Sequence, residues 1–498
     1  MSLRRNILAN YVGQAYLTSA NILIVPIYLR YMGAEAYGLI GFFALIQTWF
    51  QLLDLGVSHT LSREVARYRG GATTAGELRR LMQTLEVIFA VVGLVGALGV
   101  AMLAQTIAHR WLRVEHLPLP LVTWALRVTG ATVAVRWVSG IYRSVLTGFE
   151  EQVWLNGLNI LAGTARTFLT MALFSLVGTD VLAFATYQFM VSVVELVALV
   201  TRTRRALPTS TERSPWSFEP LRGVLKFSLS VAFAGAVWVT VGQSDKLVLS
   251  KVLSLKEFGT FTLGVLGASA ISVVSGPVSQ ALLPRLARLA AEGDESKFLE
   301  LYRSSTQWVC VLIAPISAVL VVYAEPLLLA WTSRTEQAHA AAPVLRLYSL
   351  GNGFIAIAAF QYYLQYARGN LRLHVAGNIG FVIALLPLLV WSAKRFGALG
   401  AGAVWVAQSV LYLLVWTWVV HRRFAPELRW RWLFFDVAPT FGGVWAAAAA
   451  LHAAGIDVGT SRPRIIATVA ALAVLLLLVA LLSTRDARMA VRRRLMAS

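Results

Sequence analysis

The sequence predicts an all-α integral membrane protein of about fourteen transmembrane helices: two parallel six-helix lobes around a central cavity, followed by two C-terminal helices. Composition, hydrophobic windows and an internal repeat lead to this prediction. Hydrophobic residues make up 58% of the 498 positions and charged residues only 14%, and the mean hydropathy is +0.67. A water-soluble core of this length does not need so much apolar sequence, so composition places the chain in a bilayer.

The spans come from windows of about 20 residues, the length that crosses a bilayer core as a helix. The first seven are predicted at Ile7–Leu29, Ala36–His59, Leu81–Ala108, Leu121–Leu146, Val153–Val177, Val181–Thr201 and Leu221–Val248. The other seven are predicted at Phe258–Leu283, Leu301–Leu329, Val344–Tyr366, Leu371–Ala393, Ala398–Val420, Leu433–Ala454 and Ile465–Leu482.

An internal repeat divides the spans into two sets of six. A shift of about 221 residues superposes Tyr37-Gly38 on Phe258-Gly259, Val57–Arg67 on Val278–Arg288, and Gly148 on Gly369. Because each half has an even number of spans, both halves enter the membrane from the same side and are related by an axis along the membrane normal. The predicted parts are an N-terminal lobe at 1–205, a cytoplasmic linker at 206–220, a C-terminal lobe at 221–423, and an appended helix pair with a basic tail at 424–498.

The basic residues predict the orientation, since Lys and Arg that flank a span are retained in the cytoplasm. With the N-terminus inside, the inside segments hold 29 of the 44 Lys and Arg residues, the outside loops hold 10, and 5 lie within spans. Both termini are therefore predicted to be cytoplasmic. The net charge of +20 reflects this retention and attraction to anionic lipid, so the expected partner is the bilayer and not nucleic acid.

No motif in the chain names an enzyme. The seven histidines are dispersed without a metal-ligand spacing, and the sequence contains no Gly-rich phosphate loop or nucleophile elbow. The single cysteine, Cys310, cannot form an intramolecular disulfide. We expect no catalytic residue, no cofactor and no metal.

Polar residues recur at spacings that place them on one face of a predicted helix. Arg136 and Arg143 are seven positions apart, although Arg143 lies near the inside end and is interpreted as a snorkelling anchor. The amides on such faces are Asn10, Gln14, Gln47, Gln51, Asn156, Asn159 and Asn352. The alternative is that these amides only join neighbouring helices or lie at the headgroup level.

Ionisable groups within the spans are costly. Nine are predicted there: Arg127, Arg136, Arg166, Lys246, Arg346, Asp54, Glu86, Glu195 and Asp245. At about 2.5–3.5 kcal/mol per central charge, exposing all of them to lipid would cost on the order of 20–30 kcal/mol, more than the net stability of most folds. The sequence therefore predicts a hydrated, somewhat cationic cavity. Glu325 and Asp436 are left out because both are expected at the headgroup level.

The segment from Pro26 to Gly38, with Asp54-Leu55-Gly56 and Arg63 after it, resembles the opening of the bacterial polysaccharide flippases, the Wzx-type O-antigen and exopolysaccharide translocases. Three later motifs agree with that family's pattern: Leu146-Thr147-Gly148, Ala367-Arg368-Gly369-Asn370 and Gly397-Ala398-Leu399-Gly400-Ala401-Gly402. The resemblance implies a superfamily that also includes multidrug exporters of the MATE type and lipid II flippases.

The resemblance implies a substrate, an undecaprenyl-diphosphate-linked oligosaccharide that crosses from the cytoplasmic to the periplasmic leaflet of the bacterial inner membrane by alternating access. Cations suit the diphosphate and amides suit the sugar hydroxyls. The cavity cations are then Arg127, Arg136, Arg166 and Arg346, the seven amides named above serve the sugar, and the candidates for ion coupling are Asp54, Glu86 and Asp245. A polysaccharide polymerase and chain-length proteins are possible partners.

Three alternatives stay open at this point. A MATE-type exporter of cationic drugs would favour an acidic, aromatic cavity, whereas basic groups within the spans outnumber acidic ones by five to four. A lipid II flippase would share the fold and the diphosphate chemistry. A polysaccharide polymerase or ligase usually carries a long periplasmic loop, but the longest outside loop predicted here is only Arg110–Pro120.

The charge count generates a topology prediction. Reporter tags at the N-terminus, within Arg202–Glu219 and at the C-terminus should all report a cytoplasmic location, because the basic flanks of the spans are retained on that side. The measurement is paired alkaline phosphatase and fluorescent protein fusions. A periplasmic signal at any of the three positions would contradict the fourteen-span arrangement.

Overall fold

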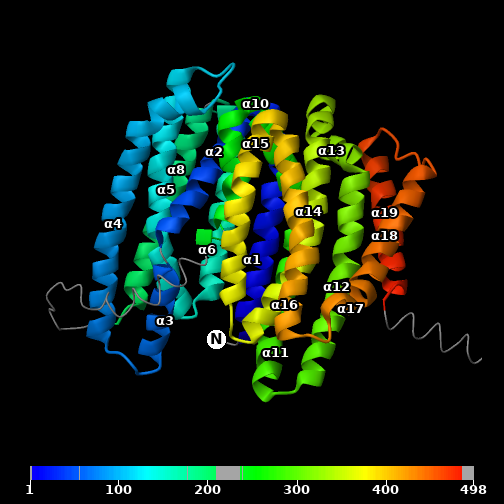
Figure 1. Cartoon of the computed structure of the whole chain (residues 1–498). Helices are drawn as coiled ribbons and strands as arrows, with labels where there is room; N and C mark the ends of the chain where they lie inside the picture. The colour runs from blue at the N-terminus through cyan, green and yellow to red at the C-terminus, as the bar shows by residue number, and fades with distance from the viewer. Residues whose placement is uncertain (1–2, 55, 177, 209–235, 238, 485–498) are drawn as a thin grey trace, which may run out of the picture. The chain divides into compact units, whose positions relative to one another are not determined.

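The computed structural model describes residues 3–54, 56–176, 178–208, 236–237 and 239–484. Every regular element in those residues is a helix (Figure 1). Ten helical stretches in this part of the chain are long and apolar enough to cross a membrane. The predicted class, an all-α integral membrane protein, is confirmed.

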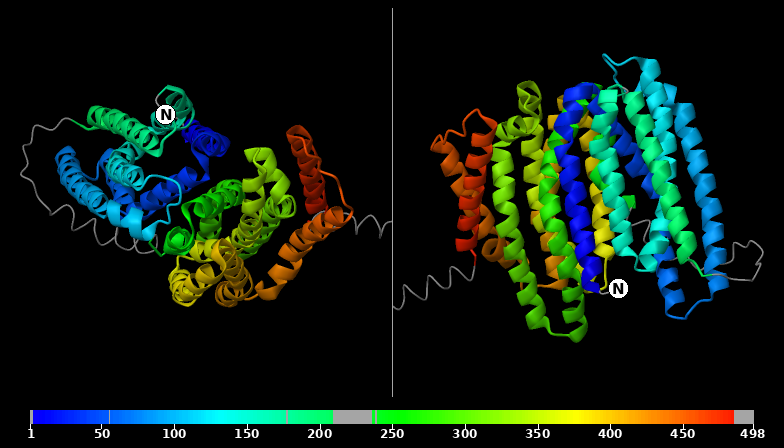
Figure 2. Two further views of the ribbon diagram at one scale, coloured as in Figure 1. Left: turned by 90° about the horizontal axis from the view of Figure 1, so that it is seen from above. Right: turned by 180° about the vertical axis from the view of Figure 1, so that it is seen from behind.

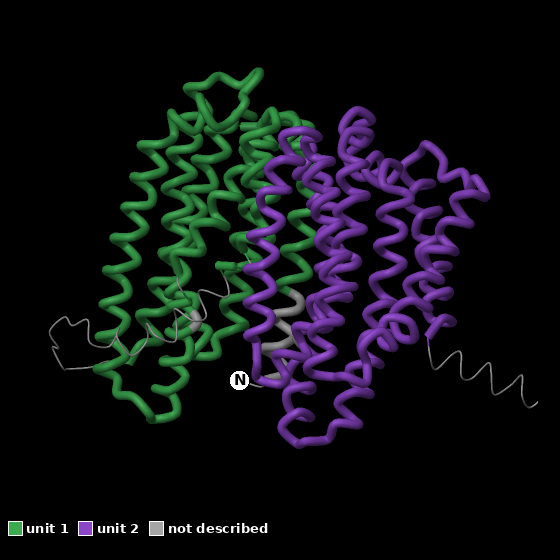
Figure 3. Tube along the Cα trace, in the orientation of Figure 1, with its two compact units in different colours: residues 1–259 green, residues 260–498 purple. Residues whose placement is uncertain are grey.

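The chain forms two compact units, Met1–Gly259 and Thr260–Ser498 (Figure 3). The helices of unit 1 are α1 Leu3–Leu23, α2 Val25–Phe50, η1 Gln51–Asp54, α3 Val57–Arg69, α4 Ala75–Thr106, η2 Ile107–Trp111, α5 Leu119–Gly148, α6 Gln152–Thr164, η3 Ala165–Leu169, α7 Thr170–Leu176 and α8 Val181–Ala206. Helix α10, Leu255–Ala268, crosses the boundary between the units. The predicted linker at 206–220 lies almost wholly outside the described residues, so the predicted lobe boundaries remain a prediction.

Unit 2 is also helical throughout its described part. Its further helices are α11 Ala270–Glu292, α12 Glu295–Val322, α13 Ala324–Thr332, α14 Thr335–Ala367, α15 Arg372–Leu411, η4 Tyr412–Trp416, α16 Thr417–Phe424, α17 Arg429–Trp432, η5 Leu433–Val437, α18 Ala438–Ala453 and α19 Arg462–Leu482. The last two pack side by side at the end of this unit (Figure 2).

Helices occupy the predicted spans wherever these are described. Of the seventh, Leu221–Val248, residues 221–235 and 238 lie outside the described residues, and the described rest is helical. Two glycines with positive φ separate spans that otherwise run on as one helix. Gly33 (φ 85°) divides α2 between the first and second spans, and Gly397 (φ 60°) divides α15 between the eleventh and twelfth. Glycine adopts these angles without the steric cost that a Cβ would add.

The predicted end of the second span, His59, is too late. Helix α2 stops at Phe50, the tight turn of η1 follows, and Gly56 has a φ of 72°. The Asp54 carboxylate accepts a hydrogen bond from the Ser58 hydroxyl (2.5 Å), which supports the start of the separate helix α3. Hydropathy did not detect this break because apolar residues continue through it.

Large side chains on α4 show what surrounds the bundle. Val95 is 64% exposed and Met102 is 76% exposed. In water such a face would be unfavourable, whereas in a bilayer it contacts lipid tails. The buried core of unit 1 lies on the opposite side, where Leu85 packs with Ile141 and Val145.

A reciprocal glycine contact joins α2 to α10 within unit 1. A Cβ added at Gly38 would collide with the Leu255 carbonyl oxygen, and a Cβ added at Gly259 would collide with the Ala34 carbonyl oxygen. The repeat shift of 221 residues pairs Gly38 with Gly259 and Ala34 with Leu255. Each helix therefore presents the equivalent glycine position to the other, which is the contact pattern of a two-fold relation. Small residues permit this close approach of the two backbones.

Further along, the match of Gly148 with Gly369 is wrong. Gly148 lies within α5, where an added Cβ would meet Val65, whereas Gly369 has nothing within 4 Å of that position and a φ of 65°. The structural counterpart of Gly369 is Glu150, whose φ is 61°, and the backbone hydrogen bonds of the two turns follow the same pattern. The offset at the ends of α5 and α14 is therefore two residues shorter than 221, because loop lengths differ between the halves.

The glycine contact generates a stability prediction. Gly38→Ala and Gly259→Ala should each destabilise the protein by about 1–3 kcal/mol, since backbone atoms occupy the space that a Cβ needs. The measurements are membrane abundance and the thermal unfolding midpoint in detergent. Gly99→Ala in α4 is the matched control, because nothing lies within 4 Å of its Cβ position. Equal midpoints for Gly38→Ala and Gly99→Ala would contradict the close helix contact.

Candidate functional site

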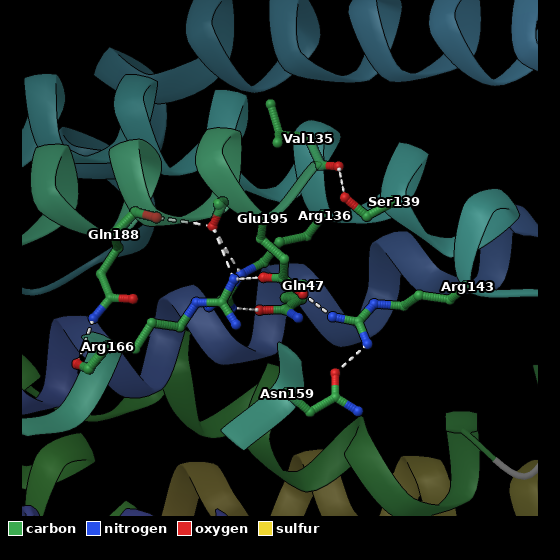
Figure 4. Close-up of polar contacts among 10 residues, drawn as sticks. Gln47, Val135, Arg136, Ser139, Arg143, Asn159, Arg166, Gln188 and Glu195 are labelled. Carbon is green, nitrogen blue, oxygen red and sulfur yellow. Dashed lines mark hydrogen bonds and ion pairs between the residues drawn. The ribbon is translucent and has the colours of Figure 1, made fainter. Parts of the chain in front are cut away.

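A cluster of charged side chains lies inside unit 1 (Figure 4). Arg136 and Arg143 come from α5, Arg166 from η3 and Glu195 from α8. The two α5 arginines are seven residues apart and therefore lie on the same side of their helix, two turns apart. Helix α8 packs extensively along α5, which brings Glu195 to this face.

Glu195 is the centre of the cluster. It is only 4% exposed, and its carboxylate pairs with the guanidinium groups of both Arg143 and Arg166. Each oxygen has its own arginine partner, so one carboxylate joins α5, η3 and α8. Ion pairs of this kind are strongly held when the surroundings exclude water, because a buried charge left without a partner is very costly.

Arg136 contacts neutral groups instead. Its Nε donates to the Ser192 hydroxyl (3.2 Å) and its Nη1 donates to the Gln47 side-chain oxygen (2.6 Å). Arg166 Nη2 also reaches the Ser192 hydroxyl, at 3.4 Å. Among the described residues no carboxylate forms an ion pair with Arg136, so its charge is held by dipoles from α2 and α8.

The π-helical turn η3 positions Arg166. The carbonyl oxygen of Arg166 accepts hydrogen bonds from the Thr170 hydroxyl (2.7 Å), the Tyr28 hydroxyl (3.1 Å) and the Gln188 amide (3.1 Å). These three donors satisfy a backbone acceptor that the irregular turn exposes, and they fix the residue from three directions. Single π-turns within α-helices are frequent at functional sites.

Amides from α6 border the cluster. The Asn159 side-chain oxygen accepts a hydrogen bond from Arg143 Nη1. Asn156 donates to the Gln152 carbonyl oxygen (2.7 Å) and lies against Gly13 of α1, where an added Cβ would meet its side-chain oxygen at 2.6 Å. Four of the predicted candidates, Gln47, Arg136, Asn159 and Arg166, thus belong to one connected network.

The cluster carries more positive than negative charge. Three guanidinium groups lie around one carboxylate, which pairs with only two of them, Arg143 and Arg166. The nearby acid on α4, Glu86, accepts a hydrogen bond from the Tyr142 hydroxyl (3.0 Å). Within the described part of the chain it forms no ion pair with these arginines. The arrangement therefore offers a place for an additional anion.

Arg127 is not part of the network around Glu195. Its guanidinium lies over the ring of Trp124, 4.7 Å from the ring centroid, and Trp124 is 54% exposed. Arg346 lies on α14 in unit 2, is exposed, and has no ion pair among the described residues. Its role as a cavity cation stays a prediction.

The remaining amides have other surroundings. Asn352 donates to the Ala268 carbonyl oxygen (3.0 Å) and accepts from Trp405 Nε1 (3.1 Å). It therefore joins α10, α14 and α15, as expected if the amides only connect neighbouring helices. Gln14 and Gln51 are exposed. The side chain of Asn10 lies outside the described residues.

The three predicted coupling acids are far apart in the chain and differ in their contacts. Asp54 accepts from the Ser58 hydroxyl and Glu86 from the Tyr142 hydroxyl, as described above. Asp245 is buried and accepts from the backbone N–H of Lys246 at 2.8 Å. None of these contacts assigns an ion to the site.

One sequence interpretation needs correction. Arg143 does not reach toward the interface as a snorkelling anchor, because the buried Glu195 holds its guanidinium. The expected headgroup level of Asp436 stays a prediction. Asp436 is only 1% exposed and pairs with Arg303 Nε at 2.8 Å, while Gln307 donates to its other oxygen at 2.8 Å. In contrast, Glu325 is partly exposed and contacts His339 at 3.1 Å.

Sequence reasoning placed Glu195 among the costly charges of the spans and, with Asp54 and Glu86, among the acids that the arginines could neutralise, but it did not name Ser192. The seven-residue spacing of Arg136 and Arg143 was one signal for the site. The three-residue spacing of Ser192 and Glu195, which places both on one face of α8, was a second signal that was not used.

The comparisons with known proteins agree with this fold. A family model described as polysaccharide biosynthesis protein matches residues 3–290, and a second, described as lipid II flippase MurJ, matches residues 266–480. A Shigella flexneri protein described as a candidate O-antigen transporter is 16% identical over 422 residues, covering 85% of this chain and 98% of the relative.

Solved structures share the architecture across most of their length. An inward closed lipid II flippase MurJ matches with a TM-score of 0.73 and 11% identity, covering 96% of this chain and 98% of that structure. An inward-facing MATE family transporter of the MOP superfamily matches with a TM-score of 0.63 and 13% identity, covering 84% and 99% respectively. Because the first family model spans more than half of the chain, the resemblance to polysaccharide flippases of this superfamily is confirmed: the chain belongs to the polysaccharide biosynthesis protein family.

Proposed function

We propose that this protein is a flippase that moves a polyprenyl-diphosphate-linked oligosaccharide from the cytoplasmic to the periplasmic leaflet of the bacterial inner membrane. The observation that carries the proposal is the surplus of guanidinium groups over carboxylates around Glu195. Membership of the polysaccharide biosynthesis family and the O-antigen relative support the substrate class.

The chemistry of the substrate fits the cluster. A diphosphate cannot cross hydrocarbon unaided, and arginine is suited to phosphate because its planar fork donates two parallel hydrogen bonds. Arg136 is the arginine most available for exchange, because only neutral groups hold it. An incoming phosphate oxygen would replace the Gln47 and Ser192 contacts, and the released amide and hydroxyl would then be free to bind sugar hydroxyls.

The wider mechanism follows from the fold class. The polyprenyl tail would stay in lipid while the headgroup passes through a hydrated cavity between two lobes that rock against each other. Asp54, Glu86 and Asp245 remain candidates for ion coupling. In this proposal both termini are cytoplasmic, the protein performs no catalysis, and a polymerase and chain-length proteins act on the product at the periplasmic face.

A second candidate function is lipid II transport, which the lipid II flippase family model over residues 266–480 favours. Its substrate carries the same diphosphate, so the arginine cluster fits both. The lipid-linked intermediate that accumulates on the inner leaflet when the protein is depleted distinguishes them. A multidrug exporter is disfavoured, because a cluster with surplus guanidinium charge repels cationic drugs.

The cluster generates a functional prediction. Arg136→Ala should abolish glycan export while membrane abundance stays near normal, because no carboxylate loses a partner. Arg136→Lys should retain part of the activity, since a point charge attracts phosphate but lacks the fork. Surface glycan and membrane abundance are measured on the same cells. Arg110→Ala, on the exposed turn η2, is the control. Normal glycan with Arg136→Ala would rule out the cationic site.

A second prediction separates folding from transport at Glu195. Glu195→Ala should lower abundance, because two partly buried guanidinium groups lose their partner. Removing one member of a fully buried pair costs about 3–5 kcal/mol, which sets the upper limit here. The double variant Glu195→Leu with Arg166→Leu removes one charge of each sign and should recover much of the abundance, yet it should not recover glycan export. Recovery of export together with abundance would show that the pair serves only the fold.

A further inference from the structure

A cavity of about 720 Å³ lies in unit 2, between the C-terminal half of α11 and the start of α12. These two helices form the hairpin at the lower edge of that unit in Figure 3. The lining residues that matter here are Arg285, Arg288, Lys297, Glu300, Leu289 and Leu301. The hairpin lies at the start of the ninth predicted span, on the side predicted to be cytoplasmic, and outside the network of Glu195.

The cations of this cavity differ in how they are held. Lys297 pairs with Asp294, with 2.8 Å between the ammonium nitrogen and the carboxylate oxygen. Arg288 pairs with Glu292 at 3.4 Å, and its side chain is 73% exposed. Arg285 is exposed and has no ion pair among the described residues. The guanidinium of Arg285 is therefore available to a ligand. The other two cations, Arg288 and Lys297, pair with Glu292 and Asp294.

The repeat shows that the residue at the position of Arg285 differs between the units. The 221-residue shift places α3 on this part of α11, and buried positions agree: Leu61 corresponds to Leu282, and Val65 to Leu286. At the position of Arg285, helix α3 has Glu64, whose carboxylate neutralises Arg67 at 3.1 Å. At this one position α11 therefore has a guanidinium where α3 has a neutralising carboxylate, while the apolar positions on either side keep their character.

We propose that this cavity binds the phosphate headgroup of an anionic amphiphile at the cytoplasmic membrane surface. Arg285, Arg288 and Lys297 supply charge-assisted donors for phosphate oxygens. Leu289 and Leu301 offer apolar contacts for the first part of a lipid chain. The volume is within the range of small-molecule sites, about 300–1,000 Å³. A prenyl diphosphate and an anionic phospholipid share this chemistry, and the experiment below distinguishes them.

The test uses the full-length protein in phosphatidylcholine nanodiscs with radiolabelled farnesyl diphosphate as the probe. An Arg136→Ala background removes binding at the cluster in unit 1, so failure here would leave the proposed transport site untouched. Arg285→Glu should weaken probe binding about tenfold, the effect of losing about 1.4 kcal/mol. Arg423→Glu, an equal charge change at an exposed position of unit 2, should leave affinity within about twofold.

A second arm adds phosphatidylglycerol to the nanodiscs. Loss of probe binding there identifies phospholipid as the occupant, and retained binding identifies the diphosphate. Arg285→Gln, with elution as a single species on size exclusion, guards against a folding defect in Arg285→Glu. Equal probe affinity in the parent and in both Arg285 variants would overturn the proposal.

Discussion

The carboxylate of Glu195 is the constraint on which unit 1 depends. It is buried, it accepts from Arg143 and Arg166, and so it joins α5, η3 and α8 at one point. In low dielectric such a group must keep its partners, and those partners in turn cannot leave without exposing a charge to hydrocarbon. Arg136 extends the network to α2 through Gln47. The ion pairs of Glu195 therefore fix three helices, and beside them lies Arg136, an arginine that only neutral groups hold.

A second constraint is close backbone packing. Gly38 and Gly259 allow α2 and α10 to approach until the backbone atoms touch, and the contact is reciprocal under the repeat shift. Neither helix could carry a side chain at that position. This contact supports an internal duplication more strongly than sequence identity does, because it relates four backbone positions and not merely residue types. The repeat does not continue at a fixed offset. The turn after α5 and the turn after α14 are separated by two residues fewer than the 221-residue shift.

The sequence was sufficient to predict the helices because a bilayer leaves few alternatives: every backbone group must be satisfied within its own segment. The pairing within the site was harder to predict. The spacing of Arg136 and Arg143 indicated a shared face, but the partner Glu195 lies on another helix, and helix packing decides which charges meet. Asp436 shows the same limit, since its position near a span end did not indicate that Arg303 and Gln307 would contact it. Breaks at single glycines such as Gly56 were missed because hydropathy averages over them.

The duplication also separates what the scaffold requires from what was added to it. With the offset that the turns after α5 and α14 define, Arg136 corresponds to Ile355 and Arg143 to Tyr362, and both of these pack against the core of unit 2. The same helix positions in unit 2 are therefore compatible with apolar packing, and Arg136, which pairs with no carboxylate among the described residues, is not needed to neutralise one in unit 1. Charges that the scaffold does not need, and that are costly in a membrane, are retained most readily when they contact a charged ligand. The hairpins follow the same logic in the other half, because Arg285 replaces the neutralising Glu64 on an unchanged apolar face. Each half thus carries an arginine at a position where the other half has an apolar or an acidic residue.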